Sequence, residues 1–286
     1  MNLQRSFFIV LSILLLSYCR DSSPNLSNSL LKKYNFDPDN ITVIKLPQSL
    51  REISGLAFLK GNEVLTHNDE EGIIFIVDIS LSKVVSDFVL DDDVEKDFEG
   101  IAVVKDSIYL VNSNGTIYKF RLQQENESAD FVKFKTFLDS ENNIEGFCYD
   151  ASTNSLLLAC KNDPGKGFKK LRAVYEFNLN KMILVKKPRF LISLDELRDK
   201  FNINGFEPSG IEKNPISGNF FMVSAHPEAI LELSPEGKIL AAYRLDEKEH
   251  KQTEGITFLQ DGTMLISDEG QKKSARISII RLKKNR

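Results

Sequence analysis

The side chains in this sequence that are best suited to chemistry are carboxylates that recur beside a glycine. Three stretches carry a glutamate directly before the glycine, and two carry a serine there with a glutamate two residues earlier. Carboxylate oxygens are the ligands that hard divalent cations prefer, calcium first and magnesium or manganese next. The five stretches are EISGLAFL (52 to 59), DFEGIAVV (97 to 104), NIEGFCYD (143 to 150), EPSGIEKN (207 to 214) and QTEGITFL (252 to 259).

Carboxylates that meet at one place repel one another. Either some of them are protonated, with raised pKa values, or a cation lies among them. We expect a divalent cation, calcium first, with Glu99, Glu145 and Glu254 as its principal ligands and Glu52 and Glu207 as further ones. A structural alternative stays open, in which each glutamate accepts hydrogen bonds from backbone N–H groups of a neighbouring unit.

The same five stretches repeat at a nearly constant spacing. Their glycines are residues 55, 100, 146, 210 and 255, so the successive spacings are 45, 46, 64 and 45 residues. A period of about 40 to 50 residues, with several short β runs in each unit, indicates a β-propeller in which one unit is one four-stranded blade. We therefore predict an all-β fold, a five-bladed β-propeller. The fifth unit has only three strands, and the run at 40 to 47 is expected to supply the strand that closes the ring.

The spacing of 64 residues requires an insertion between the third and fourth blades. Ser193 and Glu196 have the spacing of a capping box, which predicts one short inserted helix within residues 193 to 204. A six-bladed ring is the alternative if the insertion holds a degenerate blade. In either ring the inner strands crowd around a channel, where glycine lets backbones approach closely. Alternation of side chains then places the residue before each glycine at one rim.

The ends of the second strands are expected to reach the same rim. They bring amides, a lysine and histidines near the carboxylates, which is enough to bind a ligand or to support acid/base chemistry. A channel histidine without a role is the alternative for His67 and His226, and His250 is expected to be solvated. The candidate ligand-binding residues are His67, Asn68, Asp69, Lys161 and His226, and residues 267 to 269 reach the rim in the fifth blade.

The N-terminus has the pattern of a bacterial lipoprotein signal. One arginine precedes an apolar run from Phe7 to Leu16, which is too short to span a membrane as a helix. The run ends in LSYC, which resembles a lipobox, although Tyr18 stands where small residues are usual. We expect a signal peptide over 1–18, lipid on Cys19, a flexible tether over 19–40 and the propeller over 41–286. An ordinary cleaved signal with an incidental cysteine is the alternative.

Two further predictions concern the thiols and the charge. Cys148 and Cys160 lie on consecutive predicted strands, in a register that holds their α carbons too far apart for a disulfide, so both are expected to be free and buried. The formal net charge is −4, and the sequence offers no basic face. We therefore expect no binding to nucleic acid.

The repeated openings resemble the SdiA-regulated, or YjiK-like, family of bacterial envelope β-propellers. The resemblance rests on SGLAF, EGIAV, EGFCY, SGIEK and EGITF together with THNDEEG (66 to 72) and ISDEG (266 to 270), and it covers about residues 41 to 284. It implies a propeller held at the envelope, with calcium in the funnel. A more distant similarity runs to gluconolactonase-like and phytase-like propellers, and it adds Asn112 and Asp268 as candidate metal ligands.

Two functions from different classes follow. The favoured one is a lipid-anchored module of the bacterial cell envelope, on the periplasmic or surface side, that binds an unidentified small ligand or envelope protein and holds a calcium ion in its funnel. It is favoured because the acidic positions are spread evenly over the blades, whereas a catalytic site usually breaks a repeat. The alternative is a metal-dependent hydrolase, of lactonase, esterase or phytase type, that uses the same funnel.

Overall fold

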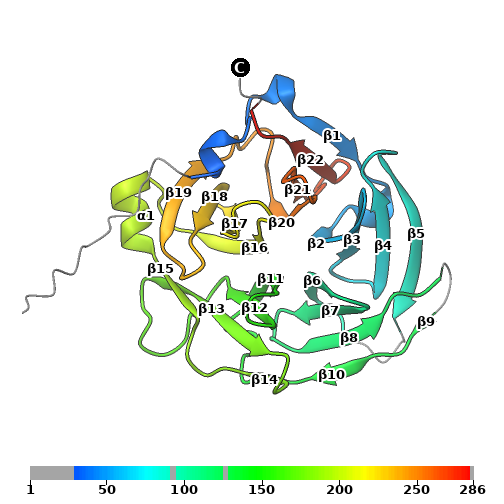
Figure 1. Ribbon diagram of the computed structural model, residues 1–286, viewed down its shortest axis with the longest axis horizontal. Helices are drawn as coiled ribbons and strands as arrows, with labels where there is room; N and C mark the ends of the chain where they lie inside the picture. The colour runs from blue at the N-terminus through cyan, green and yellow to red at the C-terminus, as the bar shows by residue number, and fades with distance from the viewer. Residues whose placement is uncertain (1–28, 91–94, 125–127, 284–286) are drawn as a thin grey trace, which may run out of the picture.

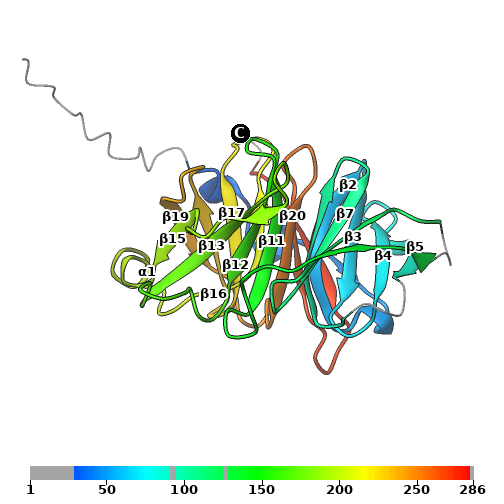
Figure 2. The ribbon, with the colours of Figure 1, turned by 90° about the horizontal axis from the view of Figure 1, so that it is seen from below.

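The computed structural model describes residues 29–90, 95–124 and 128–283. Five antiparallel sheets stand around a central channel, so the prediction of a five-bladed β-propeller is confirmed (Figure 1). The five inner strands, β2, β6, β11, β16 and β20, each begin with one of the repeated stretches. Figure 2, turned by 90°, shows that these strands run along the channel rather than across it.

The first two blades follow the predicted strand order. Short apolar runs rich in β-branched and aromatic residues, separated by turns, form each strand, as expected for half-buried or buried sheet. A short parallel strand from the second blade's outer connection, β9 (Ser128–Ala129), pairs with β5 of the first. Blade one contains β2 (Ile53–Lys60), β3 (Glu63–Asn68), β4 (Ile73–Asp78) and β5 (Lys83–Leu90), and blade two contains β6 (Phe98–Val104), β7 (Ser107–Asn112), β8 (Ile117–Arg121) and β10 (Val132–Phe134).

Blade three has a divided outer edge. Two strands pair with β13 (Leu171–Asn178): β14 (Ile183–Leu184) near its end and β15 (Phe190–Ser193) near its beginning. Helix α1 (Leu194–Phe201) follows directly, capped by the Ser193 side chain, which accepts a hydrogen bond from the Glu196 N–H. The predicted inserted helix is therefore confirmed, and β15 with α1 accounts for the long interval without a sixth blade. The inner strand of this blade is β11 (Ile144–Asp150), and its second strand is β12 (Ser155–Cys160).

The last two blades close the ring. Residues 42 to 45 pair with residues 276 to 279, so the predicted closing strand is confirmed as the outer strand of blade five. A ring closed in this way leaves no open edge between the chain ends. Blade four contains β16 (Glu207–Lys213), β17 (Phe220–His226), β18 (Ala229–Leu233) and β19 (Ile239–Arg244), and blade five contains β20 (Thr253–Phe258), β21 (Met264–Asp268), β22 (Arg276–Ile280) and β1 (Thr42–Lys45).

The core consists of five buried apolar clusters, one between each pair of neighbouring blades. Cys148 lies in the cluster between blades three and four, with Leu197 of α1, whereas Cys160 lies between blades two and three. Both thiols are free and buried, as predicted. Their separation into different clusters is the structural reason that they do not pair.

The segment before the propeller differs from the prediction. Residues 29–40, which the sequence analysis assigns to a flexible tether, are packed against blades four and five, with Leu31 and Tyr34 buried. The Glu232 carboxylate accepts hydrogen bonds from the N–H groups of Leu30 and Leu31, at 3.1 and 2.9 Å, at the start of the short helix η2 (Leu31–Lys33). A tether is therefore wrong for this part, because buried apolar side chains and a capping carboxylate hold it in place. Two more short 3-10 helices follow, η3 (Pro38–Asn40) and η4 (Gln48–Leu50).

The predicted signal peptide and Cys19 lie outside the described residues. Within the part of the chain that is described, no helix has the length and apolarity that crossing a membrane requires.

Candidate binding site in the central channel

A β-bulge at the start of each inner strand changes the direction in which the side chain before the glycine points. In blade two the pairing skips from Phe98 to Gly100, and the same shift recurs in blades three, four and five. In blade one the pairing skips from Ile53 to Leu56. The skipped residue is unpaired, and such bulges re-aim a side chain. Simple strand alternation, on which the sequence analysis relied, therefore does not describe this position. Glu99, Glu145 and Glu254 are the skipped residues in three of the blades.

The glycines allow the inner strands to approach closely, as predicted. A Cβ atom on Gly100 would lie 2.4 Å from Cβ of Phe147 in the next blade, and one on Gly255 would lie 2.8 Å from the carbonyl oxygen of Ser54. No side chain fits at such distances. The channel is consequently narrow where the glutamates enter it, and charged groups there have little water around them.

Glu99, Glu145 and Glu254 line one small cavity of about 10 Å³, to which all five inner strands contribute. Burial, and then the charges of Glu145 and Glu254, raise the pKa of Glu99 to about 10. Burial, and then Glu145 and Glu269, raise the pKa of Glu254 to about 8. At neutral pH these two carboxyls therefore hold protons. Raised pKa values are one of the two outcomes expected from the sequence.

Lys161 brings a positive charge to the cluster. Its Nζ atom lies 2.8 Å from Oε1 of Glu145, which also accepts a hydrogen bond of 2.9 Å from the Asn143 amide. Burial raises the pKa of Glu145 even so, because Lys161 and Asn143 only partly offset it. The other oxygen, Oε2 of Glu145, is buried and has no hydrogen-bond partner among the described residues. An orphaned carboxylate oxygen in a buried site requires an explanation, and an unseen cation is one.

A second layer of carboxyls lies above the first. Burial, and then Asp69 and Glu52, raise the pKa of Glu269 to about 7. Burial also raises the pKa of Asp69, whose Oδ1 atom has no partner among the described residues. Glu269 was expected only at the rim and was not assigned as a ligand. The signal that it belongs to the site was available, because it follows β21 as Asp69 follows β3.

The remaining predicted metal ligands are held by other contacts. Asn112 donates two hydrogen bonds of 2.8 Å to the carbonyl oxygens of Glu95 and Lys96. Asp268 lies 3.0 Å from Nδ1 of His250 and 3.2 Å from Nε of Arg276, and it accepts a hydrogen bond from Thr253. These contacts hold loops and strand ends rather than facing the three glutamates. Glu52 pairs with Arg51 at 2.8 Å, and Glu207 is half-buried at the start of β16.

The predicted ligand-binding residues separate into two groups. Lys161 and Asp69 lie with the carboxyls, as expected. His67 instead serves the fold: its Nε2 accepts the Gly55 N–H at 3.3 Å, its Nδ1 lies 3.0 Å from the Asn68 carbonyl oxygen, and burial lowers its pKa to about 4. Asn68 bonds to Ser49 and Glu71 in the adjoining loops. His226 is exposed at the end of β17.

His250 is the clearest local error of the sequence analysis. It was expected in solvent, but its side chain is buried against Asp268. The run of charges around it hid a residue that pairs with a buried carboxylate from another strand. Contacts between distant segments of this kind leave no local pattern in a sequence.

The structural alternative for the glutamates finds no support in the hydrogen bonds. Within the described residues, no backbone N–H donates to the carboxyl groups of Glu99, Glu145 or Glu254. Serines at the equivalent positions do this structural work instead: the Ser209 hydroxyl donates to the Thr253 carbonyl oxygen at 2.5 Å, and the Ser54 hydroxyl to that of Glu99 at 3.2 Å. The glutamates are therefore not needed to join the blades.

The donor set suits a hard cation, although the side chains are not arranged around one. Among the described residues, no group of three or more His, Cys, Asp or Glu side chains has a geometry that holds a metal ion. The carboxylate oxygens of three blades around one cavity, and the unpartnered Oε2 of Glu145, nevertheless fit calcium chemically.

Comparison with known proteins agrees with this architecture. The family model described as SdiA-regulated matches the C-terminal part of the chain. The match covers residues 188–286. The match contains all of blade four and most of blade five, including the stretches EPSG and QTEG, so the resemblance expected from the sequence is confirmed over these residues. No curated protein matches the sequence.

Solved structures show the same fold at low sequence identity. Glutaminyl cyclase from Myxococcus xanthus is 13% identical with a TM-score of 0.54, and the match covers 85% of this chain and 96% of that one. The PQQ-bound aldose sugar dehydrogenase of Streptomyces coelicolor is 13% identical with a TM-score of 0.52, covering 86% and 99%. A protein of unknown function from Bacteroides thetaiotaomicron is 12% identical with a TM-score of 0.51, covering 84% and 76%. These likenesses concern the propeller alone.

Proposed function

We propose that this propeller of SdiA-regulated type is a binding module of the bacterial cell envelope, and that a divalent cation, calcium first, binds in its channel between Glu99, Glu145 and Glu254. The observation that carries the proposal is the convergence of these three bulge residues from three blades on one buried cavity, with Oε2 of Glu145 unpartnered. The fold does not need them there, since serine fills the same position in two blades.

The protein's own groups prepare the site for a cation. Glu99 and Glu254 hold protons at neutral pH, and Lys161 balances Glu145, so the empty cluster carries little net charge. A bound cation would replace these protons and join blades two, three and five through their inner strands. Binding should therefore release protons and strengthen as the pH rises from 6 to 9. The outer carboxyls Asp69 and Glu269 add negative potential along the path into the channel.

Attachment to the envelope is the second part of the proposal. It rests on the apolar run and the LSYC sequence, with lipid on Cys19. Because the chain is packed against the propeller from Ser29 onward, only a short segment would separate the lipid from the folded ring. The channel mouth, or the loops around it, would then meet a small ligand or an envelope protein close to the membrane. Membrane fractionation of the protein and of a Cys19→Ala variant tests this attachment: the variant should be lost from the membrane fraction.

A hydrolase in the same channel is less well supported. The cavity at the three glutamates, about 10 Å³, is far smaller than the roughly 300–1,000 Å³ of typical small-molecule sites. Asn112 and Asp268, which the distant similarity offered as catalytic ligands, are bound to other groups. We therefore favour a binding role, with the cation stabilising the ring.

Thermal unfolding of the full chain tests the cation. A ligand that binds only the folded state raises the Tm, and the rise grows with the logarithm of its concentration above Kd. Calcium added after a chelator should raise the Tm, and Glu99→Gln and Glu254→Gln should each abolish the rise. Glu63→Gln, on β3 away from the channel, is the matched control and should keep it. If no divalent cation changes the wild-type Tm, the proposal is wrong. Turnover of lactones, esters or phosphoesters by the calcium-loaded protein would favour the hydrolase instead.

A further inference from the structure

A second pocket lies at the far end of the channel, where the inner strands finish. It has a cavity volume of about 190 Å³. This is less than the roughly 300–1,000 Å³ of sites for drug-sized ligands, so the pocket suits a smaller ligand. All five inner strands contribute to its wall, so it lies on the axis of the ring, on the opposite side of the glycines from the three glutamates. It is independent of the proposed cation site.

One blade departs from the repeat at this end. The position two residues after the glycine holds a small side chain in four blades, but a glutamate in blade four. The next position holds an apolar or aromatic residue in four blades, but a lysine in blade four. In blade order the first position is Ala57, Ala102, Cys148, Glu212 and Thr257, and the second is Phe58, Val103, Tyr149, Lys213 and Phe258. The lysine joins blade four to Asp150 of blade three, so the glutamate is the departure that remains to be explained.

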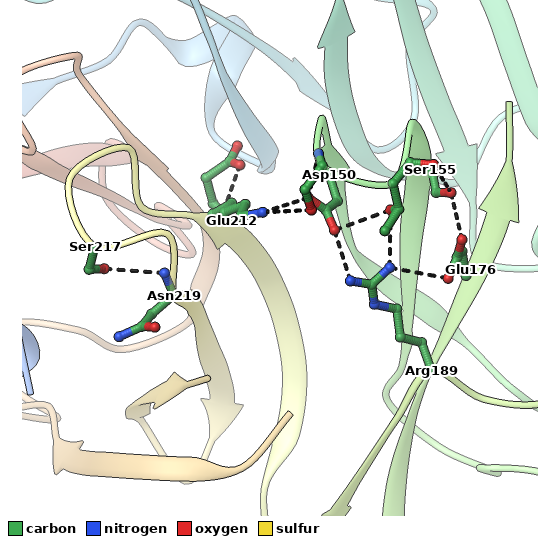
Figure 3. Close-up of polar contacts among 10 residues, drawn as sticks. Asp150, Ser155, Glu176, Arg189, Glu212, Ser217 and Asn219 are labelled. Atoms are coloured by element: carbon green, nitrogen blue, oxygen red, sulfur yellow. Dashed lines mark hydrogen bonds and ion pairs between the residues drawn. The ribbon is translucent and has the colours of Figure 1, made fainter. Parts of the chain in front are cut away.

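The lysine is drawn away from the pocket by its neighbours. Its Nζ atom lies 2.6 Å from Oδ1 of Asp150 and 3.1 Å from the Ser152 hydroxyl. Arg189 holds the other oxygen of Asp150 at 2.9 Å and reaches Glu176 at 3.2 Å, as Figure 3 shows. In this view the Glu212 carboxyl points away from the Asp150 network. Lys213 is thus neutralised, and Glu212 is left as the acidic group of the pocket.

The Glu212 carboxyl sits between polar contacts and apolar walls. Its Oε1 atom accepts the Lys213 N–H at 2.7 Å, and the Thr257 hydroxyl supplies a second hydrogen bond. Burial raises the pKa of Glu212 to about 8. The ionisable side chains near it are Cys148 and Tyr149 on β11 and Lys213 on its own strand, with Asp150 beyond Lys213. Among these groups, only Lys213 carries a positive charge, and that charge is already engaged by Asp150.

We propose that this pocket binds a small primary ammonium ion with an apolar body. The ammonium group would pair with the Glu212 carboxylate, and the apolar body would lie against the Phe58 side chain, whose ring face also attracts cations. A ligand with a carboxylate would instead meet Glu212 with like charge and would find Lys213 already bound to Asp150. The ligand must displace the proton of Glu212, so its affinity should increase between pH 6 and pH 8 and then level off.

Benzylamine and benzyl alcohol are suitable probes, because they share an apolar body and only the amine carries a charge. Binding to the full chain at pH 8, followed by NMR chemical-shift changes, should be at least tenfold tighter for benzylamine. Glu212→Gln should remove that difference, and Glu254→Gln, in the acidic cluster at the other end, should leave it intact. The second variant separates this site from the cation site, so the two proposals can fail independently.

Three results would overturn the proposal: no binding of benzylamine to the wild type, equal binding of both probes, or loss of binding through Glu254→Gln rather than Glu212→Gln. Thr257→Val gives a second measurement that does not change the charge. It removes one hydrogen bond to Glu212 and should weaken benzylamine severalfold, and unchanged affinity would contradict the geometry described. A melting curve of each variant shows that the ring is intact.

Discussion

The two ends of the channel are built from the same five strands but differ in how tightly they are packed and in how many carboxyl groups they hold. At the end where the inner strands begin, bulges place three glutamates around a cavity of about 10 Å³ between closely packed glycines. At the far end, small side chains leave a pocket of about 190 Å³ with a single glutamate. The first site is repeated and crowded, whereas the second depends on one blade. The repeat therefore fixes the positions from which side chains enter the channel, and a departure from the repeat, such as Glu212, changes the chemistry of one position.

Adding one carbon atom at each end should give the largest contrast. Gly100→Ala places a Cβ atom 2.4 Å from Cβ of Phe147 and should destabilise the protein by about 3 kcal/mol. Val103→Ile, three residues later on β6, extends into the open pocket and should change stability by less than about 0.5 kcal/mol. Urea unfolding of both variants measures this. Equal losses would show that the two ends are packed alike.

Removing one lysine at each end compares how well each carboxylate is supported. Lys161→Met removes the ammonium group that pairs with Glu145. It should lower the free energy of unfolding by roughly 2 kcal/mol at pH 8, because a buried carboxylate loses its partner. Lys213→Met should cost about half as much, because Arg189 still holds Asp150. Denaturant midpoints at pH 8 give both values. A larger loss for Lys213→Met would mean that Asp150 depends on Lys213 more than on Arg189.

The pH dependence of stability should show the protonated carboxyls. The folded-state pKa of Glu99 is about 10 and that of Glu254 about 8, both above their unfolded values, so the folded protein binds more protons between about pH 5 and 9. Stability contributed by these groups is present below their unfolded pKa and is lost as the pH rises. Glu99→Gln should flatten this decline and raise stability at pH 9 by on the order of 1–3 kcal/mol. Melting curves from pH 5 to 9, without divalent cations, test this.

Glu212→Gln should have the smallest effect on stability. Its carboxyl is already protonated near neutral pH, and glutamine keeps its shape, so the change at pH 6 should stay within about 0.5 kcal/mol. At pH 9 the variant should be modestly more stable than the wild type, because Glu212 then loses its proton. A strong loss of stability at pH 6 would show that the carboxyl is structural.

The sequence predicts the ring better than the site. The spacing of the glycines, the closing strand and the inserted helix were all recognisable, because each is a local or periodic signal. The bulges were not, since alternation assumes uniform pairing, and they decide where Glu99, Glu145 and Glu254 point. Asp268 contacts His250, and Glu232 contacts residues 29 to 31. These contacts join distant segments, so no local or periodic pattern in the sequence predicts them.

The closing blade has a consequence for the life of the molecule. Its outer strand comes from residues 42 to 45 and its other three from residues 253 to 280, so the first and last strands to be synthesised are hydrogen-bonded to each other. The ring cannot be completed until residues 276 to 280 have left the ribosome. A polypeptide without β1 has a three-stranded last blade with an unpaired edge, and one without β22 leaves β1 unpaired and only two strands in that blade. Either unpaired edge would mark the protein for quality-control proteases.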